Sequence, residues 1–203
     1  MTRALATPAR LAAGLVALTG LAALAAQCAV SHALTGGIGA TLWLLAGYFT
    51  VLTNVLATLS FFVIAWRGAS LGPSWLAGLA LWIAIVGVVY HLLLARLWAP
   101  EGLAWWADQG LHSAMPLLTL LWWLAFAPKA GLGLRDALLW LIWPLGYTAY
   151  ALIRGAITGQ YPYPFLDVTT LGYGGVALNG AGLALAFFLA GLAVLGLARA
   201  LTR

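Results

Sequence analysis

The chain consists of long apolar runs separated by short breaks that contain glycine or proline. A helix needs about 20 mostly apolar residues to cross a bilayer. No run shows the alternation with a period of two that a membrane β-barrel requires. We expect six spans, at Leu11–Val30, Ile38–Trp66, Ser74–Trp98, Gln109–Ala127, Ala137–Arg154 and Gly174–Ala198. The pattern therefore predicts an all-α polytopic membrane protein, a bundle of six transmembrane helices that forms a single domain over residues 1–203.

The composition supports this interpretation. Of the 203 residues, 65% are hydrophobic and 6% are charged, whereas soluble domains contain roughly 45–50% apolar and 25% charged residues. A soluble enzyme, a nucleic-acid-binding domain and a disordered chain are thereby excluded, and we expect membrane lipids but no nucleic acid as partners. The single cysteine, Cys28, excludes an intrachain disulfide and a thiolate zinc site. We expect no metal and no cofactor.

Positive charges are divided unequally between the two sides of the predicted bundle. If the N-terminus is inside, the outer ends of the spans carry only Arg96 and Arg154. The inner ends carry Arg3, Arg10, Arg67, Lys129, Arg135, Arg199 and Arg203. The positive-inside rule then predicts that both termini are cytoplasmic. The first apolar stretch is longer than the 7–15 residues of a signal-peptide core, so we expect it to be retained as a helix.

The strongest hydrogen-bonding side chains gather in the outer half of the predicted bundle. Thr50, Thr53 and Asn54 have the spacings of three and four residues that place side chains on one helical face. Such groups often serve only to join helices. His112 is more informative, because burial favours the neutral imidazole that a general base requires. Pro116 lacks an N–H group and frees a carbonyl at the His112 turn, so we expect a loosened helix there.

Three motifs carry a resemblance to a known family: Tyr48–Asn54 (YFTVLTN), Leu111–Leu117 (LHSAMPL) and Tyr161–Asp167 (YPYPFLD). In this order, across six spans, they resemble the prokaryotic branch of the androgen-induced protein family, which includes the androgen-dependent TFPI-regulating protein. The resemblance implies an intramembrane threonine hydrolase, in a bacterial cytoplasmic membrane, that cleaves fatty-acid esters of hydroxy fatty acids. It places the catalytic threonine at Thr50 and the catalytic histidine at His112.

This sequence departs from the family pattern at one point. The family has an asparagine three residues after its threonine, whereas here Thr53 stands at that spacing and Asn54 follows it. Thr53 is therefore an alternative nucleophile to Thr50.

The hypothesis that follows is ester hydrolysis of a lipid or fatty-acyl substrate by a Thr–His dyad, without a metal. Asn54, Tyr150, Asp167 and Asn179 are candidates to orient the histidine or to stabilise the oxyanion. Arg154 and Arg96 are candidates to bind a substrate carboxylate.

Two other functions fit the same residues. In a lipid-binding or scaffold protein without catalytic activity, the polar groups would only join helices. In a haem protein, His91 and His112 would be the axial ligands.

For Thr50 and His112 to form a dyad, the two side chains must lie at the same depth in the membrane. By residue counting, Thr50 lies about 12 residues into its span and His112 about 3, a mismatch of roughly 13 Å at 1.5 Å per residue. We expect the second span to begin in the interface and tilt, and the fourth to begin earlier, near Trp105. The two side chains should then share one cavity that is also lined by His91 or Tyr150. We further expect Tyr161–Asp167 to be a fixed loop packed over the bundle.

Overall fold

The computed structural model describes residues 5–202, so Arg3 and Arg203 lie outside the described residues. The described residues form helices and turns, without a β-strand. The α-helices are α1 (Thr7–Thr35), α2 (Ile38–Leu45), α3 (Phe49–Arg67), α4 (Pro73–Val89), α5 (Gly102–Gln109), α6 (Met115–Phe126), α7 (Leu134–Leu139), α8 (Ile142–Thr158) and α9 (Val168–Ala200). Two π-helical segments, η1 (Tyr90–Leu94) and η2 (Gly110–Ala114), and a 3-10 turn, η3 (Pro164–Leu166), complete the chain.

Five of these helical segments are long and apolar enough to cross a membrane, as expected of an integral membrane protein. They are Thr7–Thr35, Phe49–Arg67, Pro73–Leu94, Leu134–Thr158 and Val168–Ala200. The fourth predicted span is not among the five. It corresponds to α5, η2 and α6, which follow one another without a gap from Gly102 to Phe126, so this helix begins before Trp105, as expected.

The second predicted span, Ile38–Trp66, is wrong as a single helix. It is divided into α2 and α3 by a turn at Ala46–Tyr48. The depth of Thr50 is therefore set by this break rather than by the tilt of one long helix, because Thr50 is the second residue of α3.

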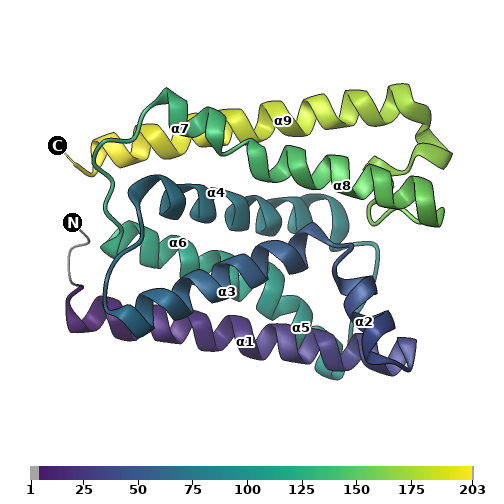
Figure 1. Ribbon diagram of the computed structural model, residues 1–203, viewed down its shortest axis with the longest axis horizontal. Helices are drawn as coiled ribbons and strands as arrows, with labels where there is room; N and C mark the ends of the chain where they lie inside the picture. Colours follow the sequence, from purple (N-terminus) through teal and green to yellow (C-terminus); the bar gives the residue numbers. More distant parts are fainter. Residues whose placement is uncertain (1–4, 203) are drawn as a thin grey trace.

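The long helices run side by side along the longest axis of the molecule (Figure 1). In this view α9, α7 and α8 form one layer, α4 and α6 lie in the middle, and α1, α3 and α5 form the opposite layer. Large apolar side chains project from the surface, and three of them, Leu34, Ile157 and Leu178, are 75–80% exposed. A lipid-facing surface has this character, because hydrocarbon does not oppose apolar exposure.

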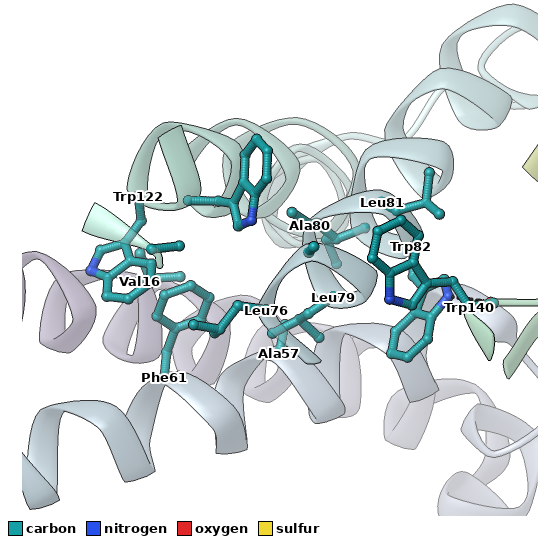
Figure 2. Close-up of a cluster of buried hydrophobic side chains, with 14 of the residues drawn as sticks. Val16, Ala57, Phe61, Leu76, Leu79, Ala80, Leu81, Trp82, Trp122 and Trp140 are labelled. Atoms are coloured by element: carbon teal, nitrogen blue, oxygen red, sulfur yellow. Dashed lines mark hydrogen bonds between the residues drawn. The ribbon is translucent and has the colours of Figure 1, made fainter. Parts of the chain in front are cut away.

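Aromatic side chains hold the layers together (Figure 2). Phe61 of α3 meets Trp122 of α6 edge to face, with ring centroids 5.1 Å apart. On the other side of α4, the indole N–H of Trp82 donates to the Trp140 carbonyl oxygen at 2.8 Å. The Trp140 indole in turn donates to the Ser74 carbonyl oxygen at 2.8 Å. These buried rings therefore combine a large contact area with satisfied N–H groups, which buried tryptophan requires.

The loop between α8 and α9 packs against the bundle, as expected. Tyr163 and Leu166 are buried in a second apolar cluster, together with Tyr90 and Tyr147. After this loop α9 begins, but Gly172 interrupts it with a φ of 66° and a ψ of 167°, a conformation that glycine adopts without steric strain. The loop and the first turn of α9 thus cover the end of the bundle at which α3 begins.

Candidate functional site

The turn between α2 and α3, which precedes Thr50, is stabilised by side chains of α8. The carbonyl oxygens at the end of a helix lack main-chain donors, and here three side chains supply them. Tyr147 donates its hydroxyl to the Gly47 carbonyl at 2.7 Å, and Tyr150 donates to the Ala46 carbonyl at 3.1 Å. The guanidinium of Arg154 donates to the Trp43 carbonyl at 2.5 Å and stacks over the Trp43 ring. A separate helix α3 can therefore begin at Phe49.

Thr50 lies in the first turn of α3, where main-chain N–H groups have no acceptor within the helix. Its N–H donates to the hydroxyl oxygen of Tyr163 at 3.4 Å. This bond ties the buried loop between α8 and α9 to the start of α3. Thr50 is partly exposed, whereas Thr53, one turn further along, is fully buried and accepts a hydrogen bond from the Trp143 indole at 3.0 Å.

His112 lies in the π-helical segment η2, where the Met115 N–H bonds the Gly110 carbonyl five residues back. In this register the next donor would be the N–H of Pro116, which does not exist. The carbonyl of Leu111 instead accepts the side-chain amide of Asn54 at 3.2 Å. The expected loosening of the helix at Pro116 is thus present as a π segment, a feature found often at functional sites.

Asn54 connects the two candidate catalytic helices. Its Nδ2 donates both to Leu111 on η2 and to the Thr50 carbonyl at 2.8 Å, and its side chain is fully buried. The two N–H groups of the amide are therefore both engaged. The Oδ1 atom has no hydrogen-bond partner among the described residues.

A carboxylate and a phenol surround the imidazole of His112. The Nδ1 atom lies 3.2 Å from Oδ1 of Asp108 and 3.0 Å from the Asp108 main-chain oxygen. The ring of Tyr90 stacks on the imidazole, with centroids 3.9 Å apart and planes at 15°. The Tyr90 hydroxyl donates to Oδ2 of Asp108 at 2.5 Å. Asp108 and Tyr90 are both buried, so this cluster is enclosed by protein.

Sequence reasoning did not identify Asp108 or Tyr90 as site residues. In the sequence, Asp108 stands just before the predicted fourth span, which begins at Gln109. A signal was available, because Asp108 and His112 stand four residues apart and such residues face each other on a helix. No comparable signal pointed to Tyr90, whose ring reaches His112 only through the packing of η1 against η2.

Thr50 and His112 line the same cavity, of about 410 Å³. Asp108, Tyr48 and Tyr163 also line it, and most of the rest of its wall is apolar. The expectation that His91 or Tyr150 lines this cavity is wrong. The ring of His91 bonds Ser113 at 3.1 Å, and Tyr150 bonds the α2–α3 break. Thr50 and Tyr163 also border a second, mainly apolar cavity of about 70 Å³ between α3, α4, α8 and α9.

The other predicted site residues have different partners. The Asp167 carboxylate accepts hydrogen bonds from Thr169 and Thr170 and caps α9, whereas the carboxylate beside His112 is that of Asp108. Asn179 donates its amide to the Phe165 carbonyl at 3.1 Å and so secures the loop. Arg96 follows η1 and is exposed.

Arg154 keeps part of its guanidinium available. Besides Trp43 it contacts the Tyr150 hydroxyl at 3.2 Å. It also lines a cavity of about 90 Å³ that shares Tyr48 and Pro162 with the larger cavity. Among residues 5–202, no group of three histidine, cysteine or acidic side chains is placed to hold a metal ion. Comparisons of the chain with family models, with curated proteins and with solved structures find no match.

Proposed function

We propose that the protein is an intramembrane lipid ester hydrolase with Thr50 as nucleophile and His112 as general base. The observation that carries the proposal is the shared cavity of about 410 Å³, lined by both side chains and largely apolar elsewhere. Its volume lies within the range of about 300–1,000 Å³ that is typical of small-molecule sites. Thr53 is the weaker candidate for the nucleophile, because its hydroxyl is buried and engaged by Trp143.

In the proposed reaction a ring nitrogen of His112 accepts the proton of the Thr50 hydroxyl as Oγ1 attacks the ester carbonyl carbon. The tetrahedral intermediate collapses, the alcohol oxygen leaves with the proton from His112, and the acyl group stays on Thr50 as an ester. Water, deprotonated by His112, then attacks the carbonyl carbon of the acyl-enzyme, and the histidinium gives that proton to Oγ1 of Thr50 as the fatty acid is released. Each step returns the histidine to its starting protonation state.

Tyr163 is the best placed group to stabilise the oxyanion. Its hydroxyl oxygen accepts the Thr50 N–H at 3.4 Å, so this hydroxyl lies beside Thr50, where it is placed to donate toward an oxyanion formed there. By analogy with serine hydrolases, one such donor is worth roughly 3–4 kcal/mol. Asn54 is less suited to this role, since both N–H groups of its amide are engaged.

The lining of the cavities supports a fatty-acyl substrate with a free carboxylate, such as a fatty-acid ester of a hydroxy fatty acid. Thr50 stands between the larger cavity and the mainly apolar one of about 70 Å³, which offer places for apolar groups on both sides of the ester. Arg154, in the adjoining small cavity, is the proposed partner of the carboxylate. Arg96 is exposed and does not line these cavities.

We also propose six membrane crossings with both termini in the cytoplasm of a bacterium. Besides the five helices long and apolar enough to span a membrane, the helical run Gly102–Phe126 would supply the remaining crossing. The start of α1 and the end of α9 lie at the same end of the molecule (Figure 1), as an even number of crossings requires. At this end Arg10 bonds the Ala65 carbonyl at 2.7 Å, close to Arg67, so basic residues gather where the positive-inside rule expects the cytoplasm.

Labelling with a fluorophosphonate, which reacts with activated hydroxyls, tests the function. Thr50→Ala should abolish labelling and the hydrolysis of lipid esters, and His112→Ala should lower the rate by about 10²–10⁴-fold. Thr119→Val is the matched control, because the Thr119 hydroxyl is buried in α6 without a partner among the described residues.

Each variant is checked for folding by its circular dichroism and its elution in detergent. Loss of labelling in Thr53→Ala but not in Thr50→Ala would move the nucleophile by one helical turn. Unlabelled wild-type protein that binds fatty acids would favour a lipid-binding protein without catalytic activity instead.

A further inference from the structure

We propose that Asp108 is a positioning residue for His112, held in place by Tyr90, so that the site is a Thr–His–Asp triad. This inference rests on the function proposed above. It assigns the orienting carboxylate to a residue four positions before the histidine on the same helical run, and it identifies the nitrogen of His112 that acts as the base.

The contacts of Nδ1 decide the tautomer of His112. Its two neighbours are Oδ1 of Asp108 at 3.2 Å and the Asp108 main-chain oxygen at 3.0 Å. Both are acceptors, so Nδ1 carries the ring proton in the neutral imidazole. The lone pair is then on Nε2, on the opposite side of the ring. Nε2 is therefore the nitrogen that accepts the proton of Thr50.

The carboxylate is itself fixed by two donors. Its Oδ2 accepts the Tyr90 hydroxyl at 2.5 Å and the Gln109 amide at 3.3 Å. With Oδ2 held in this way, Oδ1 remains directed at His112. Asp108 is 6% exposed and Tyr90 is 3% exposed, so water does not compete effectively for these bonds. Tyr90 acts twice, because its ring also stacks on the imidazole.

The two π-helical segments bring these groups together. Tyr90 is the first residue of η1, and His112 is the third residue of η2. Close approach of the two helices depends on Gly87, where a Cβ atom would lie 3.1 Å from the His112 carbonyl oxygen and 3.2 Å from the Pro116 ring. The stacking of Tyr90 on His112 is thus built into the packing of α4 against η2.

In the reaction, Asp108 orients the ring and stabilises the imidazolium that forms when Nε2 takes the Thr50 proton, and it stays ionised throughout. An Asp108→Asn substitution places a hydrogen-bond donor, in place of the carboxylate acceptor, opposite Nδ1 of His112. Tyr90 and Gln109 both donate toward Oδ2, so the amide oxygen takes that position and the NH₂ group faces Nδ1. The NH₂ group opposes a proton on Nδ1, whose remaining acceptor is the Asp108 main-chain oxygen at 3.0 Å. The share of the Nε2–H tautomer, which cannot act as base toward Thr50, therefore rises.

The test is ¹⁵N NMR of histidine-labelled protein in detergent micelles, together with hydrolysis of p-nitrophenyl octanoate. The sequence has only three histidines, so His32→Gln and His91→Gln assign the resonances of His112. Wild type should show the Nδ1–H tautomer at His112, and Asp108→Asn should raise the share of the Nε2–H tautomer. In the same variant kcat should fall by about 10²–10⁴-fold, while KM changes little.

Two further variants separate positioning from folding. Asp108→Glu keeps the carboxylate and should recover part of kcat and the Nδ1–H tautomer. Asp136→Asn is the matched control, because Asp136 bonds the Gly133 N–H at the start of α7, and it should change neither readout. An active wild type with unchanged kcat and tautomer in Asp108→Asn would overturn the positioning role alone. A wild type inert toward esters and probes would overturn the function on which it rests.

Discussion

Replacing Asn54 by leucine should destabilise the protein by about 0.5–2.5 kcal/mol, through the loss of the side-chain hydrogen bond that joins α3 to the π segment. The amide donates to the Leu111 carbonyl at 3.2 Å and to the Thr50 carbonyl at 2.8 Å. A buried acceptor that loses its only donor costs about 1–3 kcal/mol, and this applies to Leu111. The Thr50 carbonyl loses less, because it also accepts a main-chain bond within α3.

One gain offsets part of this loss. The Oδ1 atom of Asn54 is buried without a partner among the described residues, and replacing it with apolar atoms removes a penalty of roughly 1 kcal/mol. With a loss of about 0.5 kcal/mol at Thr50 included, the balance is about 0.5–2.5 kcal/mol, which corresponds to a drop in Tm of about 1–10 °C for a chain of this length. Thermal unfolding in detergent micelles, followed by circular dichroism, measures the shift.

The matched control is Thr119→Val, which removes a buried hydroxyl group that, like the Oδ1 atom of Asn54, lacks a partner among the described residues. Here no hydrogen bond is lost, so the Tm should stay the same or rise. If Asn54→Leu also left the Tm unchanged or raised it, the bond to Leu111 would not stabilise the π segment, and the account of Pro116 and η2 given above would be incorrect.

Two further predictions concern the packing of α4 and the cap of α9. Gly87→Ala should lower stability by about 1–3 kcal/mol, because the new Cβ meets main-chain oxygen and a proline ring; an unchanged Tm would contradict this close approach. Hydrogen bonds from the hydroxyl groups of Thr169 and Thr170 lower the pKa of Asp167 in the folded protein. The ionised carboxylate therefore stabilises the fold above about pH 4, the ordinary pKa of an aspartate. This stabilisation is lost as the pH falls through the lowered pKa of the folded state. The difference in Tm between wild type and Asp167→Ala should therefore narrow between about pH 6 and about pH 3, and a constant difference would refute the role of the charge.

The helical, membrane-embedded character of the chain could be predicted from composition and pattern alone. Apolar runs of about 20 residues leave helices as the structure that satisfies every main-chain group in lipid. The loop at Tyr161–Asp167 was also predictable, since its prolines stiffen it and its aromatic residues favour burial. The threonine and histidine motifs led to Thr50 and His112, which line one cavity.

The break between α2 and α3 could not be predicted from its own segment. The residues from Ile38 to Trp66 form one continuous apolar run, and the turn at Ala46–Tyr48 exists because donors from α8, about 100 positions away, pair with its carbonyl groups. A local pattern carries no information about such partners.

The surroundings of His112 were likewise decided by tertiary structure. Pro116 indicates that a carbonyl is freed, but only packing against α3 supplies the Asn54 amide that satisfies it. Similarly, Asp108 is a neighbour of His112 by helical spacing, whereas its second oxygen is fixed by Tyr90 from another helix. The sequence alone thus determined which segments are helical and which side chains are polar, because these follow from local chemistry. Which of those side chains meet was determined by the packing of helices distant in the chain.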